Sequence, residues 1–238
     1  MFYVYGIVDT RYFEPLPGAG HEAGDVVPIP SGRLAAVVSA LSVCKIEATP
    51  QNVWCHERVL ERLMPEHAVL PLRFGTTCRD ADALEEYLLH SAGGLANDLE
   101  RVRGKVEIAL RIMEDTRQIE LPQEALNDDG PAGRGAAYLR SRLQYHRCEM
   151  AQQDSSKWLE NMLRQYFDPV AKDLICAAPA DASTGFRVSC LVERDRVAVL
   201  ADALDRFRSD HSNFDVTCTG PWAPYSFVAA PPVSMVEP

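Results

Sequence analysis

KVEIALRIM, at residues 105–113, is the clearest strand pattern in the chain. Apolar residues stand at every second position from Val106 to Ile112, and charged residues such as Lys105 and Glu107 stand between them. Because successive side chains of a strand point to opposite faces, this alternation predicts a strand with one apolar and one polar face. Helices packed on the apolar face would complete a core, so the stretch indicates a layered α+β architecture.

Three further strands are predicted on the N-terminal side of this stretch. Residues 2–8 are aromatic and β-branched, and residues 34–41 are apolar almost throughout, which is typical of a strand buried on both faces. The third strand, residues 69–74, contains Pro71, which cannot donate a ladder hydrogen bond and so favours an edge position or a local bulge. A shorter strand is possible at residues 26–29.

Two helices are expected between these strands and residue 105. Thr49 and Pro50 have the residue types preferred at the N-cap and at the first helical position. Asp82 and Glu85 have the spacing of a capping box, which predicts the start of the second helix. The pair at residues 93–94, Gly-Gly, weakens that helix and favours a break.

The C-terminal side continues the alternation of strands and helices. A polar loop is predicted at residues 114–135 and a kinked helical region at 136–175. Alternating residues then predict strands near 186–192 and 214–218, separated by a helix that starts at Asp195. This order is compatible with a ferredoxin-like arrangement. We therefore expect an α+β protein of two domains, residues 1–103 and 104–228, followed by a flexible tail at 229–238.

Composition restricts the possible partners and compartments. The 238 residues carry a formal net charge of -10, which disfavours a phosphate backbone as the main partner. No signal peptide or apolar run long enough for a membrane span is present. The seven cysteines form no CxxC pair, which indicates a reducing compartment. The expectation is a cytoplasmic protein with no nucleic-acid or membrane partner.

No motif in the sequence predicts catalysis, a cofactor or a metal. Phosphate-binding loops, zinc-protease and serine-nucleophile signatures are all missing. Cys55 and His56 are adjacent on a predicted helix, where side chains point about 100° apart and do not chelate one ion easily. We interpret them as a buried thiol beside a surface imidazole. The prediction is a binding protein with no catalytic, cofactor-binding or metal-binding residues.

Two segments are unusual for a protein surface. Arg73 and Phe74 follow an apolar strand, and alternation turns Arg73 toward solvent, a carboxylate or a domain interface. In GPWAPYSFV, residues 220–228, two prolines flank Trp222 and precede Tyr225. Such an extended aromatic segment either docks on the protein's own core or is presented to a partner. Both alternatives stay open, and these four residues are the candidate partner-binding site.

Four segments resemble the gas vesicle protein L/F family, in that family's order and across nearly the whole chain. They are YVYGIV at residues 3–8, LPLRFGT at 70–76, GKVE at 104–107 and TGPWAPYSFV at 219–228. The last is the most specific because of its unusual proline and aromatic composition. Ala223 and Ile108 depart from the family pattern, which often has proline and an aromatic residue there.

The resemblance implies an accessory or minor structural protein of gas vesicles. It further implies two α+β domains, the C-terminal one a modified ferredoxin-like fold, with no catalysis. The partners implied are the small hydrophobic shell protein and other accessory proteins, and the location implied is the cytoplasm or the gas vesicle. Two alternatives remain: a small-molecule-binding domain or enzyme with an unrecognised site, and a ferredoxin-like regulatory or oligomerisation module. The oligomeric state and the binding surface are left open.

Overall fold

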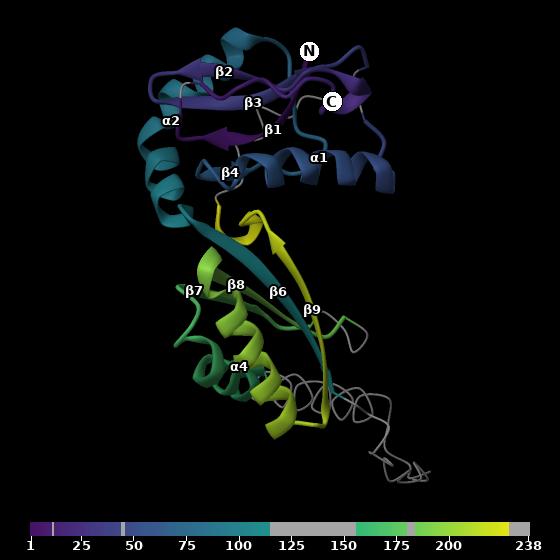
Figure 1. The fold of residues 1–238 in the computed structure, drawn as a ribbon, viewed down its shortest axis with the longest axis vertical. Helices are drawn as coiled ribbons and strands as arrows, with labels where there is room; N and C mark the ends of the chain where they lie inside the picture. The colour runs from purple at the N-terminus through teal and green to yellow at the C-terminus, as the bar shows by residue number, and fades with distance from the viewer. Residues whose placement is uncertain (11, 44–45, 115–155, 180–183, 229–238) are drawn as a thin grey trace, which may run out of the picture.

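Two sheets stacked along the long axis form the protein, each packed against helices (Figure 1). The computed structural model describes residues 1–10, 12–43, 46–114, 156–179 and 184–228. The predicted tail at 229–238, most of the predicted loop at 114–135 and the first part of the helical region at 136–175 lie outside these residues. Helices and antiparallel sheets together confirm the α+β class.

The first half of the chain contains five strands and two α-helices. They are β1 Phe2–Val8, β2 Val27–Ser31, β3 Leu34–Ala40, α1 Pro50–Leu63, β4 Val69–Pro71, β5 Thr77–Cys78 and α2 Ala81–Val102, with a 3-10 turn η1 at His21–Ala23. The sheet has the order β2-β3-β1-β4, with β5 also paired to β1. β4 lies at an edge, as Pro71 predicts.

The first sheet lies between its two helices. Tyr3, Tyr5 and Val37 pack with Leu60 of α1 in one core cluster. The opposite side of the same strands packs against α2, in a second cluster that contains the buried residues Val4, Ala36, Val38, Leu84, Leu88 and Leu99. Double coverage explains why β1 and β3 read as continuous apolar runs. It agrees with the expectation that residues 34–41 form a strand buried on both faces.

The starts of the two helices test the capping predictions. The Thr49 hydroxyl accepts a hydrogen bond from the Asn52 N–H, which confirms it as the N-cap of α1. α2 begins earlier than expected, because the carboxylate of Asp80, and not Asp82, accepts from the Ala83 N–H at 2.9 Å. The helix runs unbroken through residues 93–94. Burial of leucines on its inner face offsets the roughly 1 kcal/mol that each glycine costs.

The second half of the chain contains the other sheet, with the order β7-β8-β6-β9. Its elements are β6 Lys105–Glu114, a helix at 156–167, β7 Asp173–Ala177, β8 Phe186–Glu193, a 3-10 turn η3 at Arg194–Arg196, α4 Val197–Asp210, β9 Phe214–Trp222 and a 3-10 turn η4 at Tyr225–Phe227. Gly104, at a φ of 67°, connects the end of α2 directly to β6 (Figure 1).

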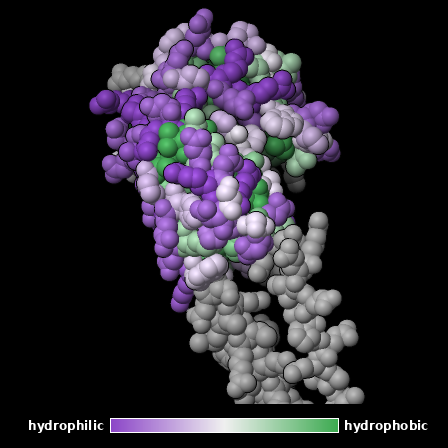
Figure 2. All heavy atoms as spheres, turned by 60° about the horizontal axis from the view of Figure 1, so that its bottom comes forward, coloured by the Kyte–Doolittle hydropathy of each residue, from purple (hydrophilic) through white to green (hydrophobic). Residues whose placement is uncertain are grey.

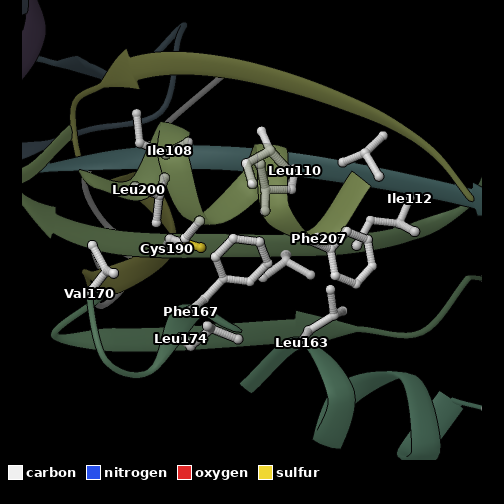
Figure 3. Packing of buried hydrophobic residues seen from close by; sticks show 14 of the residues in the cluster. Ile108, Leu110, Ile112, Leu163, Phe167, Val170, Leu174, Cys190, Leu200 and Phe207 are labelled. Atoms are coloured by element: carbon white, nitrogen blue, oxygen red, sulfur yellow. The ribbon is translucent and has the colours of Figure 1, made fainter. Parts of the chain in front are cut away.

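The two α-helices in the described residues of this half cover one face of the sheet. Figure 3 shows Phe167 and Phe207, from the two helices, pointing toward the same side chains of β6 and β8. The apolar face predicted for residues 105–113 is buried in this core at Ile108, Leu110 and Ile112. All neighbouring strands are antiparallel.

Two boundaries in this half differ from the sequence expectations. Residues 173–177 form β7 and not the end of a helix, because the helix at 156–167 already ends before Asp168 and Pro169. α4 begins at Val197, after η3, with no side-chain cap. The ferredoxin-like assignment and the domain boundary at residues 103/104 stay predictions.

Replacing Phe167 with alanine is expected to lower the free energy of unfolding by roughly 3–5 kcal/mol, because it empties a fully buried site. Urea denaturation measures the change. Trp158→Ala, on the same helix but 58% exposed, is the matched control and should shift stability by less than about 0.5 kcal/mol. Equal losses in the two variants would contradict the packing described here.

Candidate functional site

The two segments singled out in the sequence both reach α1. Phe74 follows β4 and Tyr225 lies in η4, and both contact His56 of α1. Trp222, at the end of β9, lies with its ring centroid 6.3 Å from that of Trp54 on α1. The candidate residues therefore gather where the two halves of the chain join, although they are about 150 positions apart in sequence.

His56 is the centre of this junction, and its side chain is completely buried. Its Nδ1 is 2.9 Å from the Tyr3 hydroxyl, and its Nε2 is 2.9 Å from the Tyr225 hydroxyl. The interpretation of His56 as a surface imidazole is therefore wrong. The spacing of His56 with Val59, Leu60 and Leu63 is that of one helix face, and this signal could have placed it in the core.

The hydrogen bonds define one direction of proton donation. Tyr225 donates to Glu57 at 2.7 Å, so its oxygen accepts from His56 Nε2–H. The unprotonated Nδ1 then accepts from Tyr3, whose oxygen in turn accepts from the Gly75 N–H at 3.0 Å. This chain of four bonds assigns a neutral imidazole with its proton on Nε2.

Burial suppresses the acid–base chemistry of these groups. Burial lowers the pKa of His56 to about 4 and raises the pKa of Tyr5 to about 12. Burial, with the nearby Glu57 carboxylate, also raises the pKa of Tyr225. A catalytic acid or base works best with a pKa near the working pH. The shifts of His56, Tyr5 and Tyr225 move their pKa values further from neutral pH. The arrangement favours holding the junction together over proton transfer.

Aromatic rings pack around this chain of hydrogen bonds. His21 stacks on Tyr5 at an interplanar angle of 6°, and the Tyr5 hydroxyl accepts from the His21 N–H at 2.8 Å. Phe74 lies against the rings of Tyr3, His21 and His56. The ring of Phe74 thus packs in the interior of the first half, whereas the preceding Arg73 is exposed.

Residues 223–227, which we call the C-terminal strap, connect the second sheet back to the first. Glu107 of β6 accepts from the Ser226 N–H at 2.8 Å and from its hydroxyl at 2.6 Å. Glu107 is consequently buried, although strand alternation places it on the polar face. Ala223 belongs to the core cluster on α1, and Phe227 to the cluster on α2. The strap therefore docks on the protein's own core, the first of the two alternatives.

Trp222 is only half-buried and marks the point where this segment reaches the surface. Its partner Trp54 is 53% exposed. Beside Trp54 lies a hollow of about 420 Å³ lined by Pro50, Gln51, Trp54 and Arg58. These four residues and Trp222 form what we call the tryptophan patch. Trp and Arg side chains dominate the binding energy of many protein interfaces, so this patch has the chemistry of a contact site.

Metal-binding clusters and membrane-spanning helices are both missing from the described residues. No group of three or more His, Cys, Asp and Glu side chains within them is arranged to hold a metal ion. Cys55 is half-buried, with its thiol directed at the Ala19 carbonyl. No helix in the described part of the chain is long and apolar enough to span a membrane.

Comparison with known proteins places the chain among gas vesicle proteins. The family model of the gas vesicle synthesis protein GvpL/GvpF matches residues 1–229. Gas vesicle protein L of Streptomyces sp. (strain CB03234) is 26% identical and covers 94% of this chain and 91% of its own length. Gas vesicle protein F1 of Halobacterium salinarum is 22% identical, covering 95% and 92%.

Solved structures of gas vesicle protein GvpF share the fold. The crystal structure from Anabaena sp. PCC7120 superposes with a TM-score of 0.74 at 19% identity, covering 95% of this chain and 94% of that one. The structure from Microcystis aeruginosa gives a TM-score of 0.72 at 17% identity, covering 95% and 98%.

Removing the Tyr225 hydroxyl is expected to loosen the junction. Tyr225→Phe leaves His56 Nε2–H and the Glu57 carboxylate without their shared partner, at a cost of roughly 1–3 kcal/mol of unfolding free energy. Thermal or urea denaturation measures the loss. Tyr12→Phe, at a tyrosine that is 66% exposed, is the control and should leave stability unchanged. A Tyr225→Phe protein as stable as the wild type would show that the hydroxyl is not holding the junction.

Acid is expected to destabilise the fold through His56. Because its folded pKa of about 4 lies below the ordinary value of 6.5, the unfolded chain takes up a proton first as the pH falls. This contribution to stability is fully present above pH 6.5 and decreases toward pH 4, where the loss reaches roughly 3 kcal/mol. Urea unfolding across this range measures it.

His56→Gln provides the control for this pH dependence, since other titrating groups, including Glu57 and His21, are common to both proteins. The variant should lose less stability than the wild type between pH 6.5 and 4. Parallel stability curves for the two proteins would rule out His56 as the responsible group.

Proposed function

The chain belongs to the gas vesicle synthesis protein GvpL/GvpF family, and from that premise we propose that it acts in gas vesicle formation by binding the small hydrophobic shell subunit. The family is one of gas vesicle proteins and not a known enzyme family. In the proposed role the chain is a non-catalytic accessory protein that acts in the cytoplasm or on the gas vesicle itself. Other accessory proteins are further partners in this role.

The tryptophan patch is the observation that carries the proposal. Trp54 and Trp222 come from the two halves of the chain, and both are exposed enough to touch a partner. The strap behind them is held by Tyr225 on α1 and by Ser226 on Glu107. A contact surface that is rigid before binding loses little side-chain entropy on association, which favours affinity.

The surface chemistry suits a partner that must be kept from aggregating. On the face shown in Figure 2, apolar side chains form small separate areas within a mostly hydrophilic surface. A small aromatic contact can therefore cover apolar surface of a shell subunit, while the formal net charge of -10 keeps the complex in solution. Arg58, which lines the hollow beside Trp54, and Arg73, which directly precedes Phe74, are both exposed and add cationic contacts.

Of the four candidate residues, Trp222 and Arg73 are proposed to touch the partner. Phe74 and Tyr225 are proposed to act indirectly, since their rings pack against His56 inside the junction. Trp54, which the sequence did not single out, joins the contact residues.

Capture of purified shell subunit by the immobilised chain tests the proposal. Trp54→Ala or Trp222→Ala should weaken capture about 10-fold or more, as for truncation of an interface hot spot. Arg73→Ala should have a smaller effect that diminishes at high salt. Cosedimentation with isolated vesicles provides a second measurement.

Trp158→Ala is the control, because this tryptophan is equally exposed but lies on the helix at 156–167. Its capture should equal that of the wild type. Folded wild-type protein that captures no shell subunit at any salt concentration would overturn the proposed function. Normal capture by both Trp54→Ala and Trp222→Ala would instead move the contact site elsewhere.

A further inference from the structure

A second concave surface lies on the other side of the first sheet, and the tryptophan patch does not include it. It runs between α2 and the turn joining β2 to β3, encloses about 540 Å³, and we call it the α2 groove. Its lining is mostly apolar and consists of Leu34, Leu88, Leu89, Ala92, Ala96 and Leu99, with polar residues at the margins. We infer that the α2 groove binds an amphipathic helix of a partner protein through apolar contacts and one carboxylate that pairs with Arg33.

The apolar surface of the groove is left uncovered by the chain itself within the described residues. Leu89 is 68% exposed, although it stands next to Leu88 and near Leu99, which are both buried. Ala92 and Ala96 follow on the same exposed stripe, and a side chain added at Gly93 would meet no atom within 4 Å. Small residues beside one large apolar residue let the backbone of another helix approach closely.

Polar contacts close the groove at both ends and set its length. At one end the Ser31 hydroxyl donates to the Glu85 carbonyl at 3.3 Å. At the other, Arg103 pairs with both Asp9 and Glu100. The 16 residues of α2 from Glu85 to Glu100 span roughly 22 Å, enough for about four turns of a partner helix. A helix laid in an apolar groove buries side chains at spacings of three and four residues.

Charge distinguishes the kind of helix that fits. Four charged residues line the groove, and three of them, Asp9, Glu100 and Arg103, are paired with one another. The fourth, Arg33, is exposed on the turn and has no ion pair in the part of the chain that the structure describes. A carboxylate on the partner helix satisfies this guanidinium, and a lysine at the same place is repelled. The groove therefore selects an apolar helix that carries an acidic residue.

The inference goes beyond the proposed function, because the groove and the tryptophan patch lie on opposite faces of the first sheet. α1 carries the patch on one face, and α2 borders the groove on the other. Occupation of both surfaces makes the chain a bridge between two partners. A substitution can disrupt either surface while leaving the residues of the other surface unchanged.

Binding of a synthetic helix to the full-length chain tests the inference. The probe is a fluorescein-labelled amphipathic peptide of about 16 residues, long enough for the groove, with a leucine and alanine stripe and one flanking glutamate. Fluorescence anisotropy should show saturable binding. Ala92→Trp, which fills the groove from an exposed helix position, should weaken binding about 10-fold or more, and Arg33→Glu about 5-fold.

Charge exchange separates a specific carboxylate contact from general apolar attraction. A peptide with lysine in place of the glutamate should bind the wild type more weakly than the glutamate peptide does. The same lysine peptide should bind the Arg33→Glu variant more tightly than the glutamate peptide does. Trp54→Ala, in the tryptophan patch, is the matched control and should bind the peptide normally. Thermal unfolding of each variant verifies that the fold is kept.

Several results would overturn the inference. The first is that the peptide does not bind, and the second is that it binds the wild type and Ala92→Trp equally well. The third is that the fatty acid oleate binds and the peptide does not. Sedimentation of the chain alone adds another: a dimer that Ala92→Trp dissociates would assign the groove to a second copy. Shell-subunit capture is measured separately with the same variants, so failure of the proposed function and failure of the groove are distinguishable.

Discussion

The hydrogen bonds of His56 join two parts of the chain that are far apart in sequence. One buried imidazole connects β1, through Tyr3, with the C-terminal strap, through Tyr225. A buried imidazole with two partners contributes stability, whereas one with a missing partner costs free energy. The position of the strap is consequently fixed to within hydrogen-bond tolerance. Because Glu107 holds the neighbouring Ser226, that position also sets how the second sheet meets the first.

The same arrangement explains how the tryptophan patch, the proposed contact surface, arises at the junction. The strap places Trp222 beside Trp54, and both side chains stay at least partly exposed to solvent. Tyr225 and Phe227 attach the segment to the protein interior. Within six positions of sequence, Trp222 therefore faces the surface while Tyr225 and Phe227 hold the strap in place. The family relationship supports a role in gas vesicle formation. The structure adds a physical reason for the aromatic residues of the strap, since Tyr225 hydrogen-bonds to α1 and Phe227 is buried.

Sequence patterns predicted those parts of the fold that depend on local chemistry. The alternation at residues 105–113, the Thr49 cap and the edge position of Pro71 each follow from a few neighbouring residues. Properties that depend on distant contacts were not predictable in this way. Glu107 has the alternation of a surface residue, yet Ser226, 119 positions away, covers it. His56 was misplaced for the same reason, since its buried partners come from β1 and the strap. The sequence marks Arg73, Phe74, Trp222 and Tyr225 alike as unusual. Only the structure shows that Phe74 and Tyr225 pack on His56, whereas Arg73 is exposed and Trp222 lies against Trp54.

The strap also has a consequence for the order in which the chain folds during synthesis. His56 and Tyr225 are 169 positions apart, an interval that a ribosome needs roughly 10–30 seconds to translate. During that time the first sheet and α1 exist without the residues that complete both of their apolar clusters. Until residues 223–227 have been made, the Nε2–H of His56 therefore lacks its partner, the Tyr225 hydroxyl. The proposed contact surface is completed at the same stage, because Trp222 directly precedes the strap and comes to lie beside Trp54.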